Sequence, residues 1–198
     1  MSSNNSQENK ALIVYSSGAG CTEDIALKIK EKLDNSSIKT NIVKINDKDQ
    51  FKSLEQHDIN QYSSILLGSS IIKGNFHKNI DKILAKLAST SGENKKLGFF
   101  VCCMKACNPE KIEEAKNQYI ESNLVEYGLD FSLVDAFGGR LDFSPDSSMN
   151  FMLKKILKSI MQKDNPEMKE IEPKVYDFRD WQQIDNFASS WVNIIRKG

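Results

Sequence analysis

Ala11-Leu12-Ile13-Val14-Tyr15-Ser16-Ser17-Gly18-Ala19-Gly20-Cys21-Thr22-Glu23 is the stretch that decides the fold. An apolar run passes through small residues directly into a segment of helical period. Unpaired N–H groups at a helix start, and the positive end of the helix dipole, favour an anion. Ser17 and Thr22 can add hydroxyl donors, and Gly18 and Gly20 permit a close backbone approach. The stretch therefore predicts a phosphate-binding loop at the carboxyl end of a first β-strand.

The residues absent from this loop narrow the choice of ligand. No Lys or Arg lies between Ala11 and Leu27, so amides and hydroxyls would hold the phosphate. A P-loop needs a Gly-Lys pair and is excluded. The dinucleotide pattern GxGxxG needs glycine where Glu23 stands, although Asp47 follows the second strand where a ribose carboxylate would lie. A response-regulator receiver would have acidic residues in place of Ser16-Ser17. A flavin mononucleotide (FMN) pocket needs a hydroxyl-and-glycine loop without a cation, which fits.

The composition indicates one ordinary globular domain. The 198 residues carry 27 basic and 27 acidic side chains, so no global charge favours nucleic acid or an anionic membrane. Residues 1–10 are polar and unlike a signal peptide, and the apolar runs are too short to span a bilayer. We expect a disordered tail over 1–10, a single domain over 11–198 and a cytoplasmic location.

Short apolar runs alternate with segments of helical period along the chain. Continuous apolar runs indicate strands buried on both faces of a parallel sheet. Right-handed crossovers then give a doubly wound α/β fold with its ligand crevice at the carboxyl ends of the strands. The expected strands are 11–16, 38–45, 64–69, 97–103 and 131–137. The loops expected to line the crevice are 17–22, 69–77 and 103–108.

The helical segments are less uniform. Segment 46–60 predicts only a short helix. Pro109 suits the first turn of a helix, and Asp180 is a candidate cap for the last one. Trp181 and Trp191 share the apolar face of that last helix, so we expect both to pack in the core. The expected helices are 23–34, 77–89, 109–126, about 148–163 and about 180–196.

Residues 139–173 interrupt the alternation and predict an insertion near the fifth strand. Its helix, 148–163, separates apolar residues from lysines. The apolar side holds Met149, Met152, Leu153, Ile156, Leu157, Ile160 and Met161, and the other side holds Lys154, Lys155 and Lys158. One interpretation is a helix packed on the sheet edge with a solvated lysine face. The other is a docking surface for an apolar, anionic substrate or for the membrane interface.

The four cysteines do not form a metal or disulfide pattern. Cys21 stands alone, and Cys102, Cys103 and Cys107 form a group without CxxC pairs or a nearby histidine. Cys102 and Cys103 lie within an apolar run, where cysteine acts as a small hydrophobe. Neither a zinc site nor a disulfide framework is expected.

Two stretches carry a family resemblance. Ser17 to Thr22 resembles the flavodoxin phosphate loop, Ser/Thr-x-Thr-Gly-x-Thr, with Ala19 in place of one threonine. Gly68 to His77 resembles the run Gly-Ala/Ser-Ser-Ile-x-x-Gly-x-Phe/Tyr-His of the menaquinone-dependent protoporphyrinogen oxidase branch of that superfamily. The stretches 99–111, 150–154 and 175–188 agree with this branch. The resemblance implies a five-stranded sheet of order 2-1-3-4-5 with FMN as cofactor.

The resemblance also implies an activity and a binding site. The activity is dehydrogenation of protoporphyrinogen IX, with electrons passed to a quinone. Phe76 is the only aromatic residue expected near the flavin ring, which favours an open flavin face. The implied FMN-binding residues are Ser17, Gly18, Ala19, Gly20, Cys21 and Thr22 for the phosphate, and Ser70, Ile71, Ile72, Lys73, Gly74, Cys103, Met104, Lys105 and Ala106 for the ring.

Other functions stay open at this point. The alternative is a flavodoxin-type electron carrier that serves a redox partner protein and has no substrate of its own. A flavin-binding regulator or a nicotinamide-dependent quinone reductase is a third. His77 is expected to cap its helix, and Lys105, Arg140 and Lys154 are candidates for contacts with substrate carboxylates. Helix 148–163 could hold the protein at the inner face of the cell membrane.

Overall fold

The computed structural model describes residues 10–89, 95–147, 149–164 and 170–197. The tail expected over 1–10 lies outside these residues except for Lys10, which begins the first strand. Within the described residues no helix is both long enough and apolar enough to cross a bilayer.

The predicted sheet is present, with its order confirmed. Five parallel strands are arranged β2-β1-β3-β4-β5. Their bounds are β1 Lys10–Ser16, β2 Lys39–Lys44, β3 Ser64–Ser70, β4 Lys96–Cys102 and β5 Leu133–Phe137. In register, Ser16 lies beside Ser69 and Ser70 beside Cys102, so the three central strands end at one edge.

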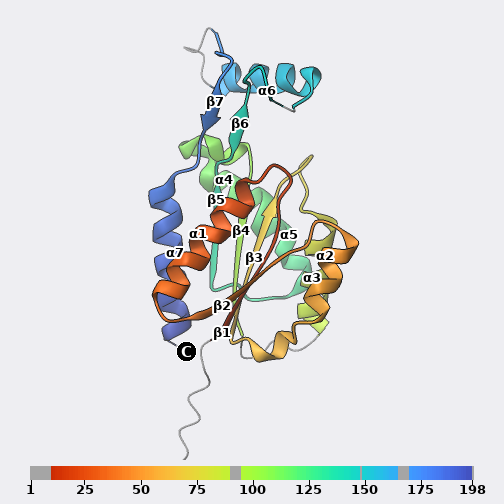
Figure 1. Ribbon diagram of the computed structural model, residues 1–198, viewed down its shortest axis with the longest axis vertical. Coiled ribbons are helices and arrows are strands. Elements are labelled where there is room, and N and C mark those ends of the chain that lie inside the picture. Colours follow the sequence, from red (N-terminus) through yellow and green to blue (C-terminus); the bar gives the residue numbers. More distant parts are fainter. Residues whose placement is uncertain (1–9, 90–94, 148, 165–169, 198) are drawn as a thin grey trace, which may run out of the picture.

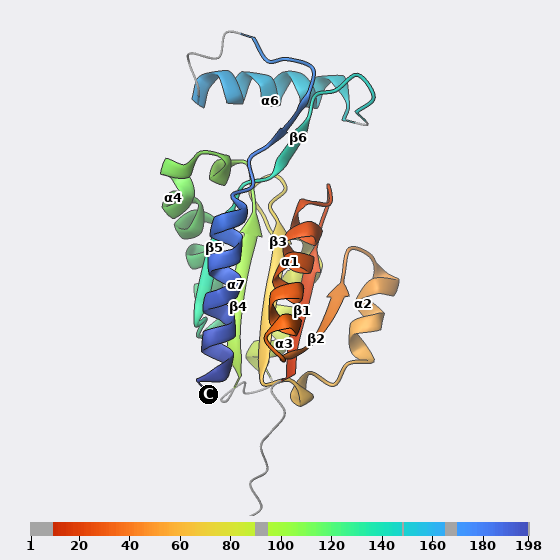
Figure 2. The ribbon, with the colours of Figure 1, turned by 60° about the vertical axis from the view of Figure 1, so that its left-hand side comes forward.

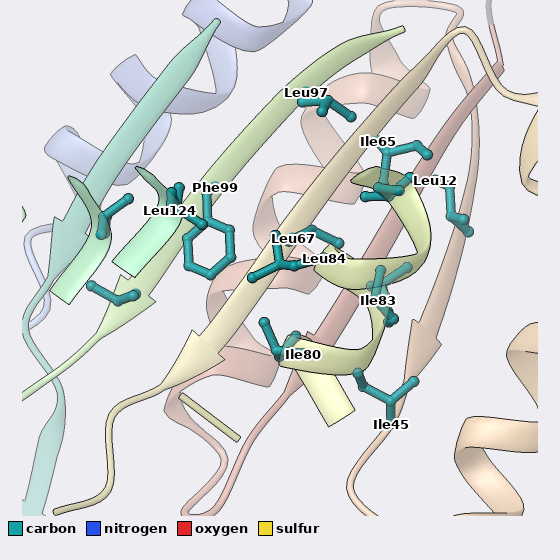
Figure 3. Close-up of a cluster of buried hydrophobic side chains, with 14 of the residues drawn as sticks. Leu12, Ile45, Ile65, Leu67, Ile80, Ile83, Leu84, Leu97, Phe99 and Leu124 are labelled. Carbon is teal, nitrogen blue, oxygen red and sulfur yellow. The ribbon is translucent and has the colours of Figure 1, made fainter. Parts of the chain in front are cut away.

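Helices cover both faces of the sheet (Figure 1). One face carries α1 (Cys21–Asn35) and α7 (Trp181–Arg196), whose buried side chains share a cluster with β1 and β4. The other face carries α2 (Lys48–Glu55), η1 (Ile59–Gln61) and α3 (Lys78–Ser89). Figure 3 shows Ile80, Ile83 and Leu84 of α3 packed against Leu12, Ile65 and Leu67 of the strands.

The segment predicted as one helix over 109–126 is helical but irregular. It runs through η3 (Pro109–Lys111), α4 (Ile112–Lys116), the π-helical turn η4 (Asn117–Glu121), α5 (Ser122–Leu124) and η5 (Val125–Tyr127). Pro109 occupies the first turn as expected. The Ser122 hydroxyl donates to the Asn117 carbonyl, and the Asn123 amide donates to two carbonyls of the same turn. These side chains stabilise the wider turn.

The cap and the core face of α7 are as predicted, with one exception. Asp180 Oδ1 accepts hydrogen bonds from the N–H groups of Gln182 and Gln183, and Trp191 is fully buried. Trp181 is 41% exposed, so the prediction that it packs in the core is wrong. As the first residue of α7 it lies at the end of the core face, where the Arg179 guanidinium stands 4.6 Å from its ring centroid.

The predicted insertion is a separate unit on two short strands. β6 (Arg140–Asp142) pairs antiparallel with β7 (Val175–Asp177), and α6 (Phe151–Asp164) follows β6. Figures 1 and 2 show α6 beyond the carboxyl ends of the parallel strands, away from both helical layers. The unit has a small core of Leu141, Phe143, Leu157, Met161 and Ile171. It therefore lies at the edge where a doubly wound fold binds its ligand.

Candidate functional site

The first expected loop joins β1 to α1. Helix α1 begins at Cys21, two residues earlier than predicted, because Gly20 takes a left-handed conformation with φ 88°. Asn46, which follows β2, fixes the start of the loop. Its Oδ1 accepts from Ser17 N at 2.9 Å and its Nδ2 donates to Ser17 O at 2.6 Å. The sequence interpretation missed Asn46, whose one signal is a polar residue directly after a buried strand.

An unpaired hydroxyl lies directly after this loop, in the first turn of α1. Thr22 is 1% exposed, and its Oγ1 has no hydrogen-bond partner among the described residues. Ser70 Oγ, at the end of β3, is also buried and unpaired. Most buried polar side chains in native proteins have partners, so each exception requires a reason. A phosphate held beside Thr22 would satisfy its hydroxyl.

The second loop is a tight hairpin that meets the first. Ile72 and Asn75 exchange backbone hydrogen bonds of 3.1 and 3.2 Å across Lys73 and Gly74. Both central residues have positive φ, 52° and 85°, which defines a type I′ turn and favours glycine at the second position. A Cβ placed on Gly18 would lie 3.4 Å from Ile72 Cδ1, so the hairpin closes against the phosphate loop.

The third loop is anchored at its start and joined to the insertion. Cys103 N donates to the Phe137 carbonyl at 3.0 Å, and the short helix η2 (Lys105–Cys107) follows. Met104 packs against the core of the insertion. Cys103 and Ala106 are buried. This loop therefore links the expected flavin site to the unit that carries α6.

Three charged residues near the loops, Glu23, Lys44 and Lys105, are already paired. Lys44 Nζ lies 2.7 Å from Glu23 Oε2, and Tyr15 donates to Glu23 Oε1 at 2.8 Å. The Lys44 hydrogen bond lowers the pKa of Glu23, and burial raises the pKa of Tyr15. Lys105 pairs with Glu114 and Gln118. Amides and hydroxyls therefore remain the natural ligands for a phosphate at this loop.

Three other candidate residues have structural partners. His77 Nδ1 accepts from Asn79 N at 3.3 Å, which caps α3 as predicted. Burial lowers the pKa of His77, which favours the neutral, accepting ring. Phe76 is partly buried and packs against the core, with its ring centroid 4.9 Å from that of Phe99. Asp47, the candidate ribose ligand, caps α2 through hydrogen bonds from Asp49 N and Gln50 N.

Only one edge of the apolar side of α6 packs against the small core of the insertion. Leu157 and Met161 are buried, while Lys154 donates to Ser144 O at 2.9 Å and Lys158 to Ile171 O at 3.3 Å. The predicted arrangement, an apolar side on the sheet edge and solvated lysines, is wrong because two lysines cap carbonyls of the insertion itself. The exposed large apolar residues are Phe151 81%, Met152 74%, Ile156 54%, Leu153 42% and Ile160 42%. This group is called the α6 apolar face below.

The chain is similar to a known protein family and, more distantly, to several solved structures. The model of the flavodoxin domain matches residues 12–170. No curated protein sequence matches the chain. Three similar solved structures are a flavodiiron core from Synechocystis, a flavodoxin bound to flavin mononucleotide from Fusobacterium nucleatum and a flavoprotein in complex with FMN from Lactobacillus acidophilus.

These structures are distant in sequence. The Synechocystis core is 15% identical with a TM-score of 0.50, and the match covers 68% of this chain and 32% of the other. The Fusobacterium nucleatum flavodoxin is 13% identical with a TM-score of 0.49, and the match covers 95% of this chain and 97% of the other. The Lactobacillus acidophilus flavoprotein is 22% identical with a TM-score of 0.45, and the match covers 65% of this chain and 92% of the other. This chain therefore spans about a third of the flavodiiron core, and the likeness to that core shows the fold alone.

Proposed function

This chain belongs to the flavodoxin domain family, and we propose that it binds FMN and serves in electron transfer. When bound, the flavin supplies one- and two-electron redox chemistry. The single observation that carries the proposal is the Thr22 hydroxyl, which is buried in the first turn of α1 and has no hydrogen-bond partner among the described residues. The phosphate group of FMN would pair that hydroxyl and use the helix N-terminus.

The residues assigned to the cofactor remain those named from the sequence. Ser17 to Thr22 would hold the phosphate. The ring would lie against Ser70 to Gly74 and Cys103 to Ala106, because β3 and β4 end side by side and deliver both loops to one edge. Phe76 is turned into the core, so no aromatic side chain from that loop would cover the ring. An open ring face suits a planar electron donor.

The finer proposal is that the donor is a porphyrinogen and the acceptor a quinone. The α6 apolar face supports this proposal. An electron carrier that binds only a protein partner has no need of an insertion with exposed apolar residues next to its flavin loops. Lys155 and Lys163 are exposed on α6, and Arg140 is exposed at the base of the insertion. These cations could meet the carboxylates of such a substrate, whereas Lys105 and Lys154 are engaged elsewhere.

The same face supports peripheral contact with the inner face of the cell membrane. Exposed apolar side chains next to lysines are typical of helices that lie in the interface plane. A quinone acceptor is membrane-dissolved, so this contact would place the flavin edge near its acceptor. The competing proposal is a carrier that passes electrons to a redox partner protein through the open ring edge.

An anaerobic assay tests the finer proposal. FMN-loaded protein is mixed with protoporphyrinogen and a menaquinone analogue, and porphyrin fluorescence is followed. We expect turnover, and a several-fold lower kcat/KM for Met152→Gln and Ile156→Gln. Leu27→Gln is the matched control, because Leu27 is a 49% exposed apolar residue on α1, away from the insertion. Fluorescence that stays at the protein-free level would favour the carrier.

A further inference from the structure

We propose that Cys21 and Cys102 form a redox-active thiol pair that hydroperoxides oxidise to a disulfide. The pair lies beneath the phosphate loop, where Cys21 begins α1 and Cys102 ends β4. The proposal concerns the sulfur atoms and does not depend on the flavin. The expectation that Cys102 acts as a small hydrophobe is incomplete, because its thiol and that of Cys21 both contact the segment Gly138 to Arg140.

Three sulfurs converge on the turn between β5 and β6. Arg140 N donates to Cys21 Sγ at 3.2 Å, Cys102 Sγ donates to Gly138 O at 3.4 Å, and Gly139 N donates to Cys107 Sγ at 3.5 Å. A Cβ placed on Gly139 would lie 3.5 Å from Cys102 Sγ and 3.9 Å from Cys21 Sγ. No side chain at Gly139 therefore separates these two sulfurs, which both face the same open side of this glycine. Among the described residues, no group of metal-ligating side chains could hold an ion.

The surroundings select Cys21 as the attacking thiolate. The Cys102 hydrogen bond, the Arg140 N–H and the charges of Arg179 and Arg140 lower the pKa of Cys21 to about 6. The N-terminus of α1 acts in the same direction. The Arg179 side chain is 6% exposed and fixed by two carboxylates, so its charge stays beside the thiol. Those carboxylates are Asp24 and Asp177.

The partner thiol, Cys102, stays protonated while Cys21 is a thiolate. The hydrogen bond with Cys21 and burial raise the pKa of Cys102, and burial raises that of Cys103 and, to about 11, that of Cys107. One thiolate next to protonated thiols is the arrangement of an attacking and a resolving cysteine. Cys102 is the resolving residue because its sulfur and that of Cys21 are the two that face Gly139, at 3.5 and 3.9 Å from a Cβ placed there.

The chemistry balances with one hydroperoxide. The Cys21 thiolate attacks the terminal oxygen of hydrogen peroxide, the O–O bond breaks, and with one proton the leaving hydroxide becomes water. Cys21 is then a sulfenic acid, oxidised by two electrons. Cys102 sulfur attacks the Cys21 sulfur, the S–O bond breaks, and the thiol proton leaves with the hydroxyl as a second water. Because Cys21 is only 7% exposed, hydrogen peroxide is the smallest and most suitable probe.

Peptide mapping tests the pair directly. Reduced full-length protein is treated with hydrogen peroxide at pH 7, alkylated in denaturant and digested with trypsin without reductant. Trypsin places Cys21 in peptide 11–28, Cys102 with Cys103 in 97–105, and Cys107 in 106–111. We expect peptide 11–28 joined to 97–105, with fragment ions that assign the bond to Cys102. Dithiothreitol should release both peptides.

Variants separate this pair from its neighbours. Cys103→Ser should keep the cross-link, while Cys102→Ser should abolish it and leave a Cys21 sulfenic acid that dimedone labels. A Cys102–Cys103 or Cys102–Cys107 bond, or no cross-link while Cys21 stays fully alkylatable, would overturn the proposal. The fragment ions of the unmodified chain decide this even if a variant fails to fold.

Discussion

Among single residues, Thr22 and Ser64 share one property, a buried hydroxyl without a hydrogen-bond partner among the described residues, at opposite ends of the sheet. Thr22 follows the carboxyl end of β1, while Ser64 begins β3 at the opposite, amino-terminal edge. The proposed site gives only Thr22 a ligand, so these two residues form a matched pair.

The first prediction uses that pair. Thr22→Val keeps the shape but removes a donor to a charged phosphate, which is worth about 1.5–3 kcal/mol. FMN should therefore bind about tenfold to a hundredfold more weakly. Ser64→Ala should leave the FMN Kd unchanged. Equal effects of the two substitutions in a fluorescence titration would mean that the loop does not hold the phosphate.

The two glycines at the root of the insertion differ in the room around them. A Cβ on Gly138 would stand 2.3 Å from the carbonyl oxygen of Phe178, whereas one on Gly139 meets nothing closer than 3.5 Å. Gly138→Ala must shift backbone and should lower the free energy of unfolding by about 1–3 kcal/mol. Gly139→Ala should be milder. Urea unfolding of both variants measures the difference, and a reversed order would contradict this geometry.

The low pKa of Cys21 predicts an unusual pH dependence. A thiol with a pKa of about 6 is mostly ionised at pH 7 and about a tenth ionised at pH 5. The rate of Cys21 oxidation by hydrogen peroxide should therefore rise about tenfold from pH 5 to pH 7. An ordinary thiol would gain about a hundredfold over this interval. Initial rates at which hydrogen peroxide removes alkylatable Cys21 from the unmodified chain, where Cys102 is present, distinguish the two slopes.

At the level of single helices, two helix starts could be predicted from their caps, while an irregular helix interior could not. The start of α7 follows from Asp180 and the start of η3 from Pro109, because helix starts depend on neighbours in the sequence. The π turn after α4 depends on where Ser122 and Asn123 direct their side chains. The exposure of Trp181 depends on where the core ends. Neither the π turn nor the exposure of Trp181 can be predicted from the spacing of apolar residues in the sequence.

The cap of α7 gives a prediction at this scale. Asp180→Ala removes the acceptor for two N–H groups and should lower the free energy of unfolding by about 0.5–2 kcal/mol. Asp180→Asn retains an acceptor and should recover most of it. Urea denaturation provides both values. An alanine variant as stable as the original chain would show that the cap contributes nothing.

Helix α6 shows why a pattern of apolar residues does not identify the surface that it covers. Its apolar side spans half of the helix, yet only Leu157 and Met161 are buried in the small core of the insertion. Lys154 and Lys158 lie inward because nearby carbonyls accept from them. The sequence predicted an amphipathic helix, but its packing edge depends on contacts 10 to 13 residues away.

In the molecule as a whole, the insertion can be removed without cutting the parallel sheet. Arg140 and Asp177 are paired neighbours, so a two-residue Asn-Gly turn can replace 141–176. The shortened protein should bind FMN with an affinity within threefold of the full chain and lose porphyrinogen turnover. Retained turnover would remove the docking role of the insertion. Lost FMN binding would show that it supports the flavin loops instead.

The site was predictable where it follows from strand order. Parallel strands that end at one edge bring together loops that are far apart in sequence, so the phosphate loop and the two ring loops could be expected at one crevice. Asn46 could not, because only the register of β2 on β1 places its amide beside Ser17. The convergence of Cys21, Cys102 and Cys107 on one turn likewise required the fold.

The most direct test of the central proposal is the titration of purified, flavin-free protein with FMN. Binding should quench flavin fluorescence with one FMN per chain and produce a yellow protein that gel filtration does not separate from its flavin. Thr22→Val should shift the midpoint to higher FMN concentration. Flavin fluorescence that stays unquenched at an equimolar or higher protein concentration would contradict the assignment of the loop.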